Sequence, residues 1–162
     1  MHPLLTAKLL VLLTLANGSP VIATRLLGRR FGRAVDGNCT FVDGRPLFGR
    51  SKTIRGLVVS LLTTAAAAPL LGLTMATGLL VGTTAMIGDL CSSFLKRRLG
   101  LAPSSRATGL DQIPESLLPL LACASILSLT AADIAIGCAV FFVGELFLSH
   151  VLFRFRLRDR PY

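Results

Sequence analysis

The chain has 162 residues, a length typical of a single domain, and hydrophobic residues make up 52% of it. This apolar composition lies outside the range of ordinary soluble domains and indicates an integral membrane protein. The net charge of +9 does not indicate a nucleic-acid partner, because the basic residues flank apolar segments, aromatic residues are sparse and tryptophan is absent.

Five apolar segments follow one another along the chain, and each is a candidate for a transmembrane helix, which needs about 20 residues to cross a bilayer. We expect these helices over residues 4–24, 57–73, 74–95, 117–129 and 134–153. The second and third segments run almost together, so they should form a tight hairpin around residues 72–78. The predicted fold is therefore an all-α integral membrane protein, with about five transmembrane helices, two structured cytoplasmic loops and a single domain over residues 1–162.

The positions of lysine and arginine predict the orientation in the membrane. Eight of the 17 lie within residues 25–55, four within residues 96–106 and four within residues 154–160. Basic loops stay on the cytoplasmic side, so five spans place the N-terminus outside and the C-terminus inside the cell's inner (plasma) membrane. A cleaved secretory signal at the N-terminus is the alternative, but it would leave four spans and put the basic tail on the side opposite to the basic loops.

Residues 34–56 form the first inner loop, which glycines and a proline divide into turns. Lys52 and Arg55 follow at the expected start of the second helix, three residues apart and therefore on one helix face. Together with backbone N–H groups near Gly49, they predict an anion site at a helix N-terminus. Asp43 has two interpretations, as a turn residue beside Gly44 or as a ligand of metal or substrate.

A second set of polar residues lies at the end of the third apolar segment. Asp89, Ser93 and Lys96 are spaced four and seven residues apart, so they share one stripe of a helix, with Arg97 at its edge. The basic residues alone could simply mark the cytoplasmic end of a membrane helix. Asp89 is not explained in this way, because an ionisable group within an apolar run is costly and is by default a functional candidate.

Carboxylates suggest the chemistry of this face. Asp111 and Glu115 follow Asp89 in the next inner segment, and carboxylate oxygens without a histidine cluster suit Mg²⁺. The chain has two histidines, His2 and His150, which disfavours hydrolysis by a histidine base. Glu145, inside the last apolar segment, is interpreted as a hydrogen-bonding group between helices in preference to a catalytic one.

These residues carry a resemblance to a known family. GDLCSSFLKRRLG (88–100) followed by LDQIPE (110–115) resembles the signature of the CDP-archaeol synthases, relatives of the phosphatidate cytidylyltransferases. DGRPLFGRSKTIRG (43–56) resembles the family's first cytoplasmic motif, and RDRPY (158–162) resembles its C-terminal end. The motifs occur in the family's order over most of the chain. The sequence departs from the pattern after LDQ, where members often carry an aspartate and this chain has Ile113, Pro114 and Glu115.

The resemblance implies a CTP-dependent cytidylyltransferase. A phosphate oxygen of a lipid would attack the α-phosphorus of CTP, giving a CDP-lipid and pyrophosphate with Mg²⁺ as cofactor. CTP and a membrane lipid phosphate are then the partners, with assembly into a homo-oligomer left open. The implied residues are Asp89, Asp111 and Glu115 for the metal, Lys96, Arg97 and Ser93 for catalysis at a phosphate group, and Lys52, Arg55 and Asp43 for substrate binding.

Three other functions stay open. One is cytidylyltransferase activity on another lipid phosphate, such as a diacyl phosphatidate. A small transporter could use Asp89 and Glu145 along its path, although a path needs polar groups on both sides of the midplane and these residues gather on one. A non-catalytic anchor that binds anionic lipid through its basic tail is the third, and it predicts that Asp89 and Asp111 are dispensable.

Overall fold

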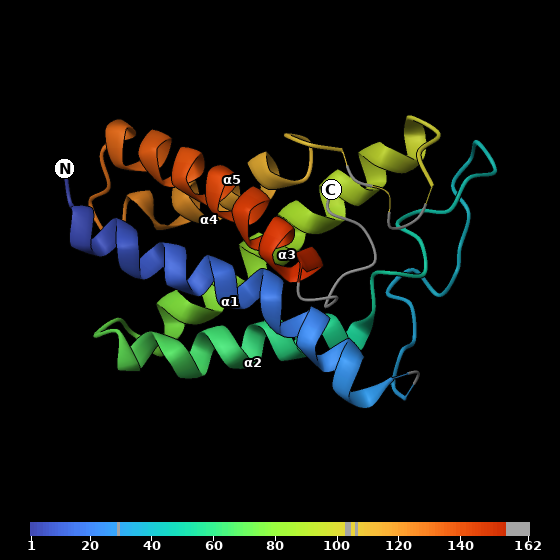
Figure 1. The fold of residues 1–162 in the computed structure, drawn as a ribbon, viewed down its shortest axis with the longest axis horizontal. Helices are drawn as coiled ribbons and strands as arrows, with labels where there is room; N and C mark the ends of the chain where they lie inside the picture. The colour runs from blue at the N-terminus through green and yellow to red at the C-terminus, as the bar shows by residue number, and fades with distance from the viewer. Residues whose placement is uncertain (29, 103–104, 106, 155–162) are drawn as a thin grey trace.

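The structure is a computed structural model that describes residues 1–28, 30–102, 105 and 107–154, with side chains described up to residue 148. This part of the chain contains five helices in order (Figure 1), which are α1 (Pro3–Leu27), α2 (Ile54–Leu70), α3 (Met75–Arg98), α4 (Gln112–Ala124) and α5 (Ala131–Arg154). Extended structure within it is limited to two isolated bridges. The predicted C-terminal motif at 158–162 and the side chain of His150 lie outside the described residues.

The predicted all-α membrane fold is confirmed. Helices α1 and α3, and α5 over Ala131–Leu148, are long and apolar enough to cross a membrane. Helices α2 and α4 are shorter, with 17 and 13 residues. Helix α2 ends at Leu70 and α3 begins at Met75, with Gly72 at φ +70° in the turn, a conformation that glycine adopts at little cost. The tight hairpin predicted here is therefore present.

The predicted bounds of the fourth helix are wrong. It begins at Gln112 and ends at Ala124, whereas the apolar run predicted residues 117–129. Pro114 lies in its first turn, where a missing N–H costs little because the first amides of a helix have no partner within the helix. Glu115 is consequently a residue of the first turn of α4 and not of the preceding loop.

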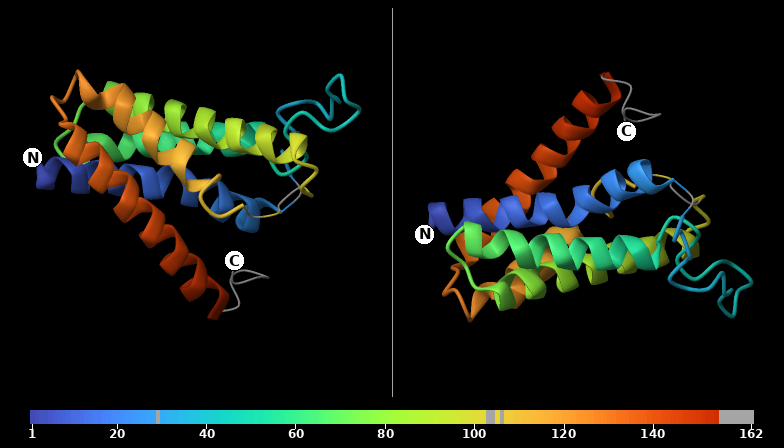
Figure 2. Two further views of the ribbon diagram at one scale, coloured as in Figure 1. Left: turned by 90° about the horizontal axis from the view of Figure 1, so that it is seen from above. Right: turned by 90° about the horizontal axis from the view of Figure 1, so that it is seen from below.

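Helices α1, α2 and α3 run lengthwise through the bundle, α4 packs against α3, and α5 crosses the bundle at an angle (Figures 1 and 2). The N-terminus, the α2–α3 turn and the α4–α5 connection lie at one end of the bundle. The long loop between α1 and α2 lies at the other end, which we call the loop end. Helix α5 packs against α4 and α1 and diverges from the bundle toward its own C-terminal end (Figure 2).

Small residues let the helices approach closely around the core. A Cβ added to Gly78 would lie 2.3 Å from the Thr64 carbonyl oxygen, so α2 and α3 touch along their backbones. A Cβ added to Gly88 would lie 2.4 Å from the Pro114 carbonyl oxygen, so the first turn of α4 rests directly on α3. The buried core beside these contacts draws on all five helices and comprises Leu9, Leu12, Leu13, Ala16, Ala68, Val81, Ala85, Leu120, Cys123 and Phe141.

The tip of the first loop holds the C-terminal end of α3. Arg45 donates to the carbonyl oxygens of Arg98 and Arg97 at 2.5 and 3.3 Å, which satisfies carbonyls that a helix end leaves without partners. The Arg98 guanidinium pairs with Asp43 at 2.6 Å and lies 4.8 Å from the ring centroid of Phe41. These contacts fix the loop against the helix that carries the stripe of polar residues.

Candidate active site

A group of five ionisable side chains lies between the first loop, α3 and α4. We call it the charge cluster, and it comprises Lys52, Asp89, Lys96, Asp111 and Glu115. The Lys52 Nζ lies 2.5 and 2.6 Å from the two carboxylate oxygens of Asp89. The Glu115 carboxyl group is within hydrogen-bonding reach of Asp89. A loop, a membrane helix and the start of another helix therefore meet at Asp89.

Lys96 lies between the two aspartates of the charge cluster, Asp89 and Asp111. Its Nζ lies 2.7 Å from Asp111 Oδ1 and donates to the Ser105 carbonyl oxygen at 3.0 Å. Its positive charge also acts on Asp89, which precedes it by seven residues, or two helical turns. Lys96 is 7% exposed. The lysine therefore neutralises carboxylates on both sides of it within a site that is largely shielded from solvent.

The polar stripe expected on α3 is the reason that these groups meet. Asp89, Ser93 and Lys96 all belong to α3, and Ser93 and Lys96 are buried. Burying charges costs several kcal/mol per ion before pairing offsets it, and replacing a buried ion pair with apolar residues often stabilises a protein. Five ionisable groups gathered in this way are poorly explained by stability alone, which favours a functional role for the charge cluster.

Two of the predicted basic residues make their hydrogen bonds elsewhere. Arg97 donates to the carbonyl oxygens of Leu101 and Ala102 at 2.5 and 2.9 Å, just beyond the end of its own helix, although its charge still acts on Asp111. Arg55 donates to the carbonyl oxygens of Arg30 and Gly28 at 2.5 and 3.1 Å and to the Thr24 hydroxyl at 3.0 Å. Their proposed contacts with phosphate stay predictions.

The helix-face argument for Lys52 and Arg55 is wrong in its premise. Helix α2 begins at Ile54, after its N-cap Thr53, so Lys52 precedes the helix and the three-residue spacing does not put both side chains on one face. The N–H group of Gly49, expected to face an anion, donates instead to Asp36 Oδ2 at 2.9 Å. Lys52 reaches the charge cluster through the course of the loop.

Asp43 adopts the turn role that its sequence context allowed. Its carboxylate accepts a hydrogen bond from the Arg45 N–H at 3.1 Å, which closes the turn at Gly44, and it pairs with Arg98 at the loop tip. These contacts give Asp43 a structural role in the loop. Its binding of substrate stays a prediction.

Asp36 is an organising residue that the motif analysis missed. Its carboxylate accepts hydrogen bonds from the backbone N–H groups of Asn38, Phe48 and Gly49 at 2.9, 3.0 and 2.9 Å. Burial raises the pKa of Asp36, but these donors outweigh burial and bring the pKa below its usual value of 3.8. The Asp-Gly-Asn sequence is the signal that could have revealed it, since aspartate accepts a hydrogen bond from the backbone two residues on in such turns.

The residues of the charge cluster offer oxygen donors that suit a magnesium ion. Asp111 Oδ1 is buried, and its nearest charged partner is the Lys96 ammonium group at 2.7 Å. The carboxyl groups of Asp89 and Glu115 lie together. Over the described residues, however, no three His, Cys, Asp or Glu side chains form one group that could hold a metal. The donor chemistry fits Mg²⁺, and the predicted set of three metal ligands stays a prediction.

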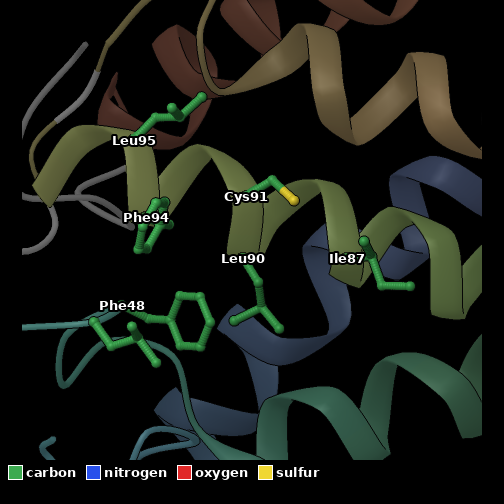
Figure 3. A pocket seen from close by; sticks show the side chains of 7 residues that line it. Phe48, Ile87, Leu90, Cys91, Phe94 and Leu95 are labelled. Atoms are coloured by element: carbon green, nitrogen blue, oxygen red, sulfur yellow. The ribbon is translucent and has the colours of Figure 1, made fainter. Parts of the chain in front are cut away.

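An apolar pocket lies on the other side of α3 (Figure 3). It has a volume of about 610 Å³ and is lined by Leu47, Phe48, Ile87, Leu90, Cys91, Phe94 and Leu95. Ile87, Cys91 and Phe94 repeat at the same spacing as Asp89, Ser93 and Lys96 but start two residues earlier, so the two stripes occupy opposite faces of the helix. Helix α3 thus separates an apolar surface from the charge cluster.

Known proteins with similar sequences decide the family. A family model described as CarS-like CDP-archaeol synthase matches residues 67–162. A CDP-archaeol synthase of Sulfurisphaera tokodaii is 35% identical over 137 residues, which are 81% of this chain and 82% of that protein. The chain belongs to the CDP-archaeol synthase family. The resemblance inferred from the motifs is therefore confirmed.

Further CDP-archaeol synthases show the same relationship. That of Pyrobaculum arsenaticum is 40% identical over 111 residues, 65% of this chain and 66% of that protein. That of Pyrococcus furiosus is 40% identical over 123 residues, 69% of this chain and 70% of that protein. A solved structure described as an intramembrane enzyme for archaeal membrane lipid biosynthesis superposes with a TM-score of 0.71 at 27% identity, covering 85% of this chain and 90% of that one. The fold is thus shared with a membrane-embedded enzyme.

Proposed function

We propose that this chain is a CTP-dependent cytidylyltransferase that converts an archaeal-type ether-lipid phosphate to a CDP-lipid and releases pyrophosphate. Membership of the CDP-archaeol synthase family supports the reaction and the lipid class. The observation that carries the proposal is the charge cluster, in which Lys52 from the loop and Glu115 from α4 meet Asp89 of a membrane helix.

The reaction joins two anions, so repulsion between them is its first obstacle. An oxygen of the lipid phosphate forms a new bond to the α-phosphorus of CTP, and the bond from that phosphorus to the bridging oxygen of the β-phosphate breaks as pyrophosphate leaves. Lys52 and Lys96 supply fixed positive charge at the place where these phosphates would meet, which lowers the repulsion and orients them. Each ammonium group is already held by a carboxylate, so little reorganisation is needed when a phosphate arrives.

The carboxylates of the charge cluster would hold the magnesium ion. We assign Asp89 and Glu115 to it, with the buried Asp111 oxygen that pairs with Lys96 as a further ligand. A bound Mg²⁺ neutralises phosphate charge and polarises the phosphorus that is attacked. The chain's own contribution is to keep these oxygens oriented, through Lys52 on Asp89 and Lys96 on Asp111.

We place the charge cluster on the cytoplasmic side, with the N-terminus outside and the C-terminus inside. The first loop and the C-terminal end of α3 lie at the same end of the bundle (Figures 1 and 2), and both are rich in lysine and arginine, as cytoplasmic segments are. In this orientation the lipid phosphate stays at the inner interface and CTP enters from the cytoplasm.

One assay tests the proposal. Purified protein in detergent is incubated with labelled CTP, Mg²⁺ and one of three lipid phosphates, namely an archaeal-type ether-linked lipid phosphate, a diacyl phosphatidate or a polyprenyl phosphate. We expect pyrophosphate release together with a CDP-lipid, identified by mass spectrometry, and the highest rate with the ether lipid. A higher rate with diacyl phosphatidate would support the alternative substrate. Release of no pyrophosphate with any lipid would overturn the proposal in favour of a transporter or an anchor.

A further inference from the structure

We propose that Asp36 is the positioning residue for Lys52 and that it sets the place of that ammonium group in the active site. This inference rests on the proposed function for its meaning in catalysis, but the contacts that carry it concern the loop alone. Among the described residues, Asp36 forms no hydrogen bond with a member of the charge cluster. Its effect on Lys52 would therefore be transmitted through the backbone of the loop.

The first step is the set of hydrogen bonds by which Asp36 holds the later part of the loop, at Phe48 and Gly49. Its Oδ2 accepts hydrogen bonds from two consecutive N–H groups, those of Phe48 and Gly49. Its Oδ1 accepts a hydrogen bond from the N–H of Asn38. One carboxylate thus joins the start of the loop to a segment twelve to thirteen residues later, and the residue is 9% exposed.

The second step leads from these hydrogen bonds of Asp36 to Lys52. The Lys52 N–H donates to the Gly49 carbonyl oxygen at 3.1 Å, and its carbonyl oxygen accepts a hydrogen bond from the Val35 N–H at 2.8 Å. Both backbone groups of Lys52 are therefore bonded to residues next to, or held by, Asp36. An isolated bridge between Ala34 and Thr53 closes the same pair of segments. The position of the Lys52 backbone follows from the conformation that Asp36 imposes.

The third step is the reach of the side chain. Lys52 precedes α2 and extends to Asp89, a residue 37 positions later in the sequence. A flexible lysine contributes most to a reaction when its position is fixed beforehand, and a misplacement of about 1 Å can lower a rate by roughly 100-fold. In the described part of the loop, two isolated bridges stand in place of a strand or helix, so we assign this constraint on Lys52 to the carboxylate of Asp36.

The hydrogen bonds of Asp36 also hold a residue that lines the apolar pocket. Phe48, whose N–H group Asp36 holds, lines the pocket together with Leu47 (Figure 3). A change at Asp36 would therefore move the pocket wall along with Lys52. An effect transmitted only to the pocket would leave the environment of the Lys52 amine unchanged, which gives a way to separate the two routes.

The test combines kinetics with chemical labelling of lysine amines. The chain has three lysines, Lys8, Lys52 and Lys96, and their acylation by an amine-reactive reagent can be quantified by mass spectrometry of the purified protein in detergent, without substrates. In Asp36→Ala we expect kcat to fall by roughly 10- to 100-fold and Lys52 to become several-fold more reactive relative to Lys8. Lys96 should keep its protection. In Asp36→Asn the amide oxygen can still accept from Phe48 and Gly49, so both effects should be smaller.

Asp133→Ala is the matched control. Asp133 is also a buried carboxylate that accepts several hydrogen bonds, from the His2 N–H and from the Thr130 N–H and hydroxyl, but it lies at the end of the bundle opposite to the loop. This variant should keep near-normal kcat and Lys52 protection. Unchanged Lys52 reactivity in Asp36→Ala would overturn the inference, as would an equal rise at Lys52 and Lys96, which indicates general loosening. Should the unmodified protein form no CDP-lipid, the proposed function fails, while the labelling still decides whether Asp36 positions Lys52.

Discussion

At the scale of single residues, the site depends on charges that neutralise one another away from water. Lys52 and Asp89 are 21% and 19% exposed, and Asp89 also lies beside Glu115. Removing one partner of a buried ion pair leaves an uncompensated charge and typically costs about 3–5 kcal/mol. Substitutions here therefore act on both folding and chemistry, and each prediction needs a measurement for each.

Replacing Lys52 with methionine removes its charge and keeps the length of the side chain. We expect kcat/KM for CDP-lipid formation to fall by about 10²–10³-fold, which is typical when one preorganised electrostatic group is removed from an active site. Lys52→Arg, which keeps the charge but not the compact ammonium group, should retain part of the activity. Lys8→Met is the control, because Lys8 lies near the N-terminal end of α1, at the end of the bundle opposite to the loop end. Activity of Lys52→Met within a few-fold of the unmodified protein would contradict the role of Lys52.

The carboxylates give a prediction about magnesium. Glu115→Gln and Asp111→Asn keep the shape of each side chain and remove its charge, so both should raise the Mg²⁺ concentration needed for half-maximal activity, and Asp89→Asn should leave little CTP-dependent product. Removing Mg²⁺ with a chelator should abolish turnover, and adding it back should restore turnover. Thermal unfolding in detergent identifies variants that fail to fold. A metal role is refuted for any of the three whose variant keeps normal turnover and normal Mg²⁺ dependence.

At the scale of helices, the contact between α3 and α4 determines whether the carboxylates meet. Gly88 is the point of contact, since a Cβ there would lie 2.4 Å from the Pro114 carbonyl oxygen and 2.8 Å from the Glu115 nitrogen. Asp89 follows Gly88 directly, and Glu115 follows Pro114. This close backbone contact between the two helices is thus adjacent to both carboxylates.

Gly88→Ala should therefore separate the charge cluster without touching a charge. The new methyl group must push α4 away from α3, which we expect to cost about 1–3 kcal/mol of unfolding free energy and to lower kcat by roughly 100-fold through misplacement of Glu115. Gly18→Ala is the control, because nothing lies within 4 Å of a Cβ there and alanine favours a helix. Full activity in Gly88→Ala at an unchanged melting temperature would show that the contact does not position the site.

Helix geometry explains which parts of this site the sequence could predict. Asp89, Ser93 and Lys96 share a stripe because spacing along one helix is local. The meeting of Lys52 with Asp89 is not local, since it depends on a loop that Asp36 folds. The apolar run predicts too late a start for α4, because Gln112 and Glu115 are polar and polarity alone does not distinguish a first helical turn from a loop. The family motifs indicated the members of the charge cluster without these contacts, because a motif identifies residues and not the contacts between them.

At the scale of the whole molecule, the bundle has two chemically different ends. The loop end carries the charge cluster and the basic residues of the first loop and of the end of α3, whereas the α2–α3 turn at the opposite end carries no lysine or arginine. Helix α3, with 24 residues, is roughly 36 Å long, enough to cross a hydrocarbon core of about 30 Å. The asymmetry of charge therefore predicts which end faces the cytoplasm.

Cysteine labelling tests this orientation. Cys39 is exposed in the first loop, whereas Cys91 lies on the apolar face of α3, Cys123 is buried and Cys138 is partly buried in α5. A maleimide that cannot cross membranes should modify Cys39 in inside-out vesicles and leave it unmodified in intact cells. The reason is that the reaction needs a thiolate in water, and among these four thiols Cys39 alone lies in a loop.

Two controls make the result interpretable. Cys39→Ser should abolish labelling in inside-out vesicles, which shows that the helical thiols do not contribute. Ser128→Cys, in the connection between α4 and α5 at the opposite end, should give the reverse pattern when introduced into Cys39→Ser, with labelling in intact cells. Labelling of Cys39 from outside would reverse the orientation and place the charge cluster away from cytoplasmic CTP, a result that is incompatible with the proposed reaction.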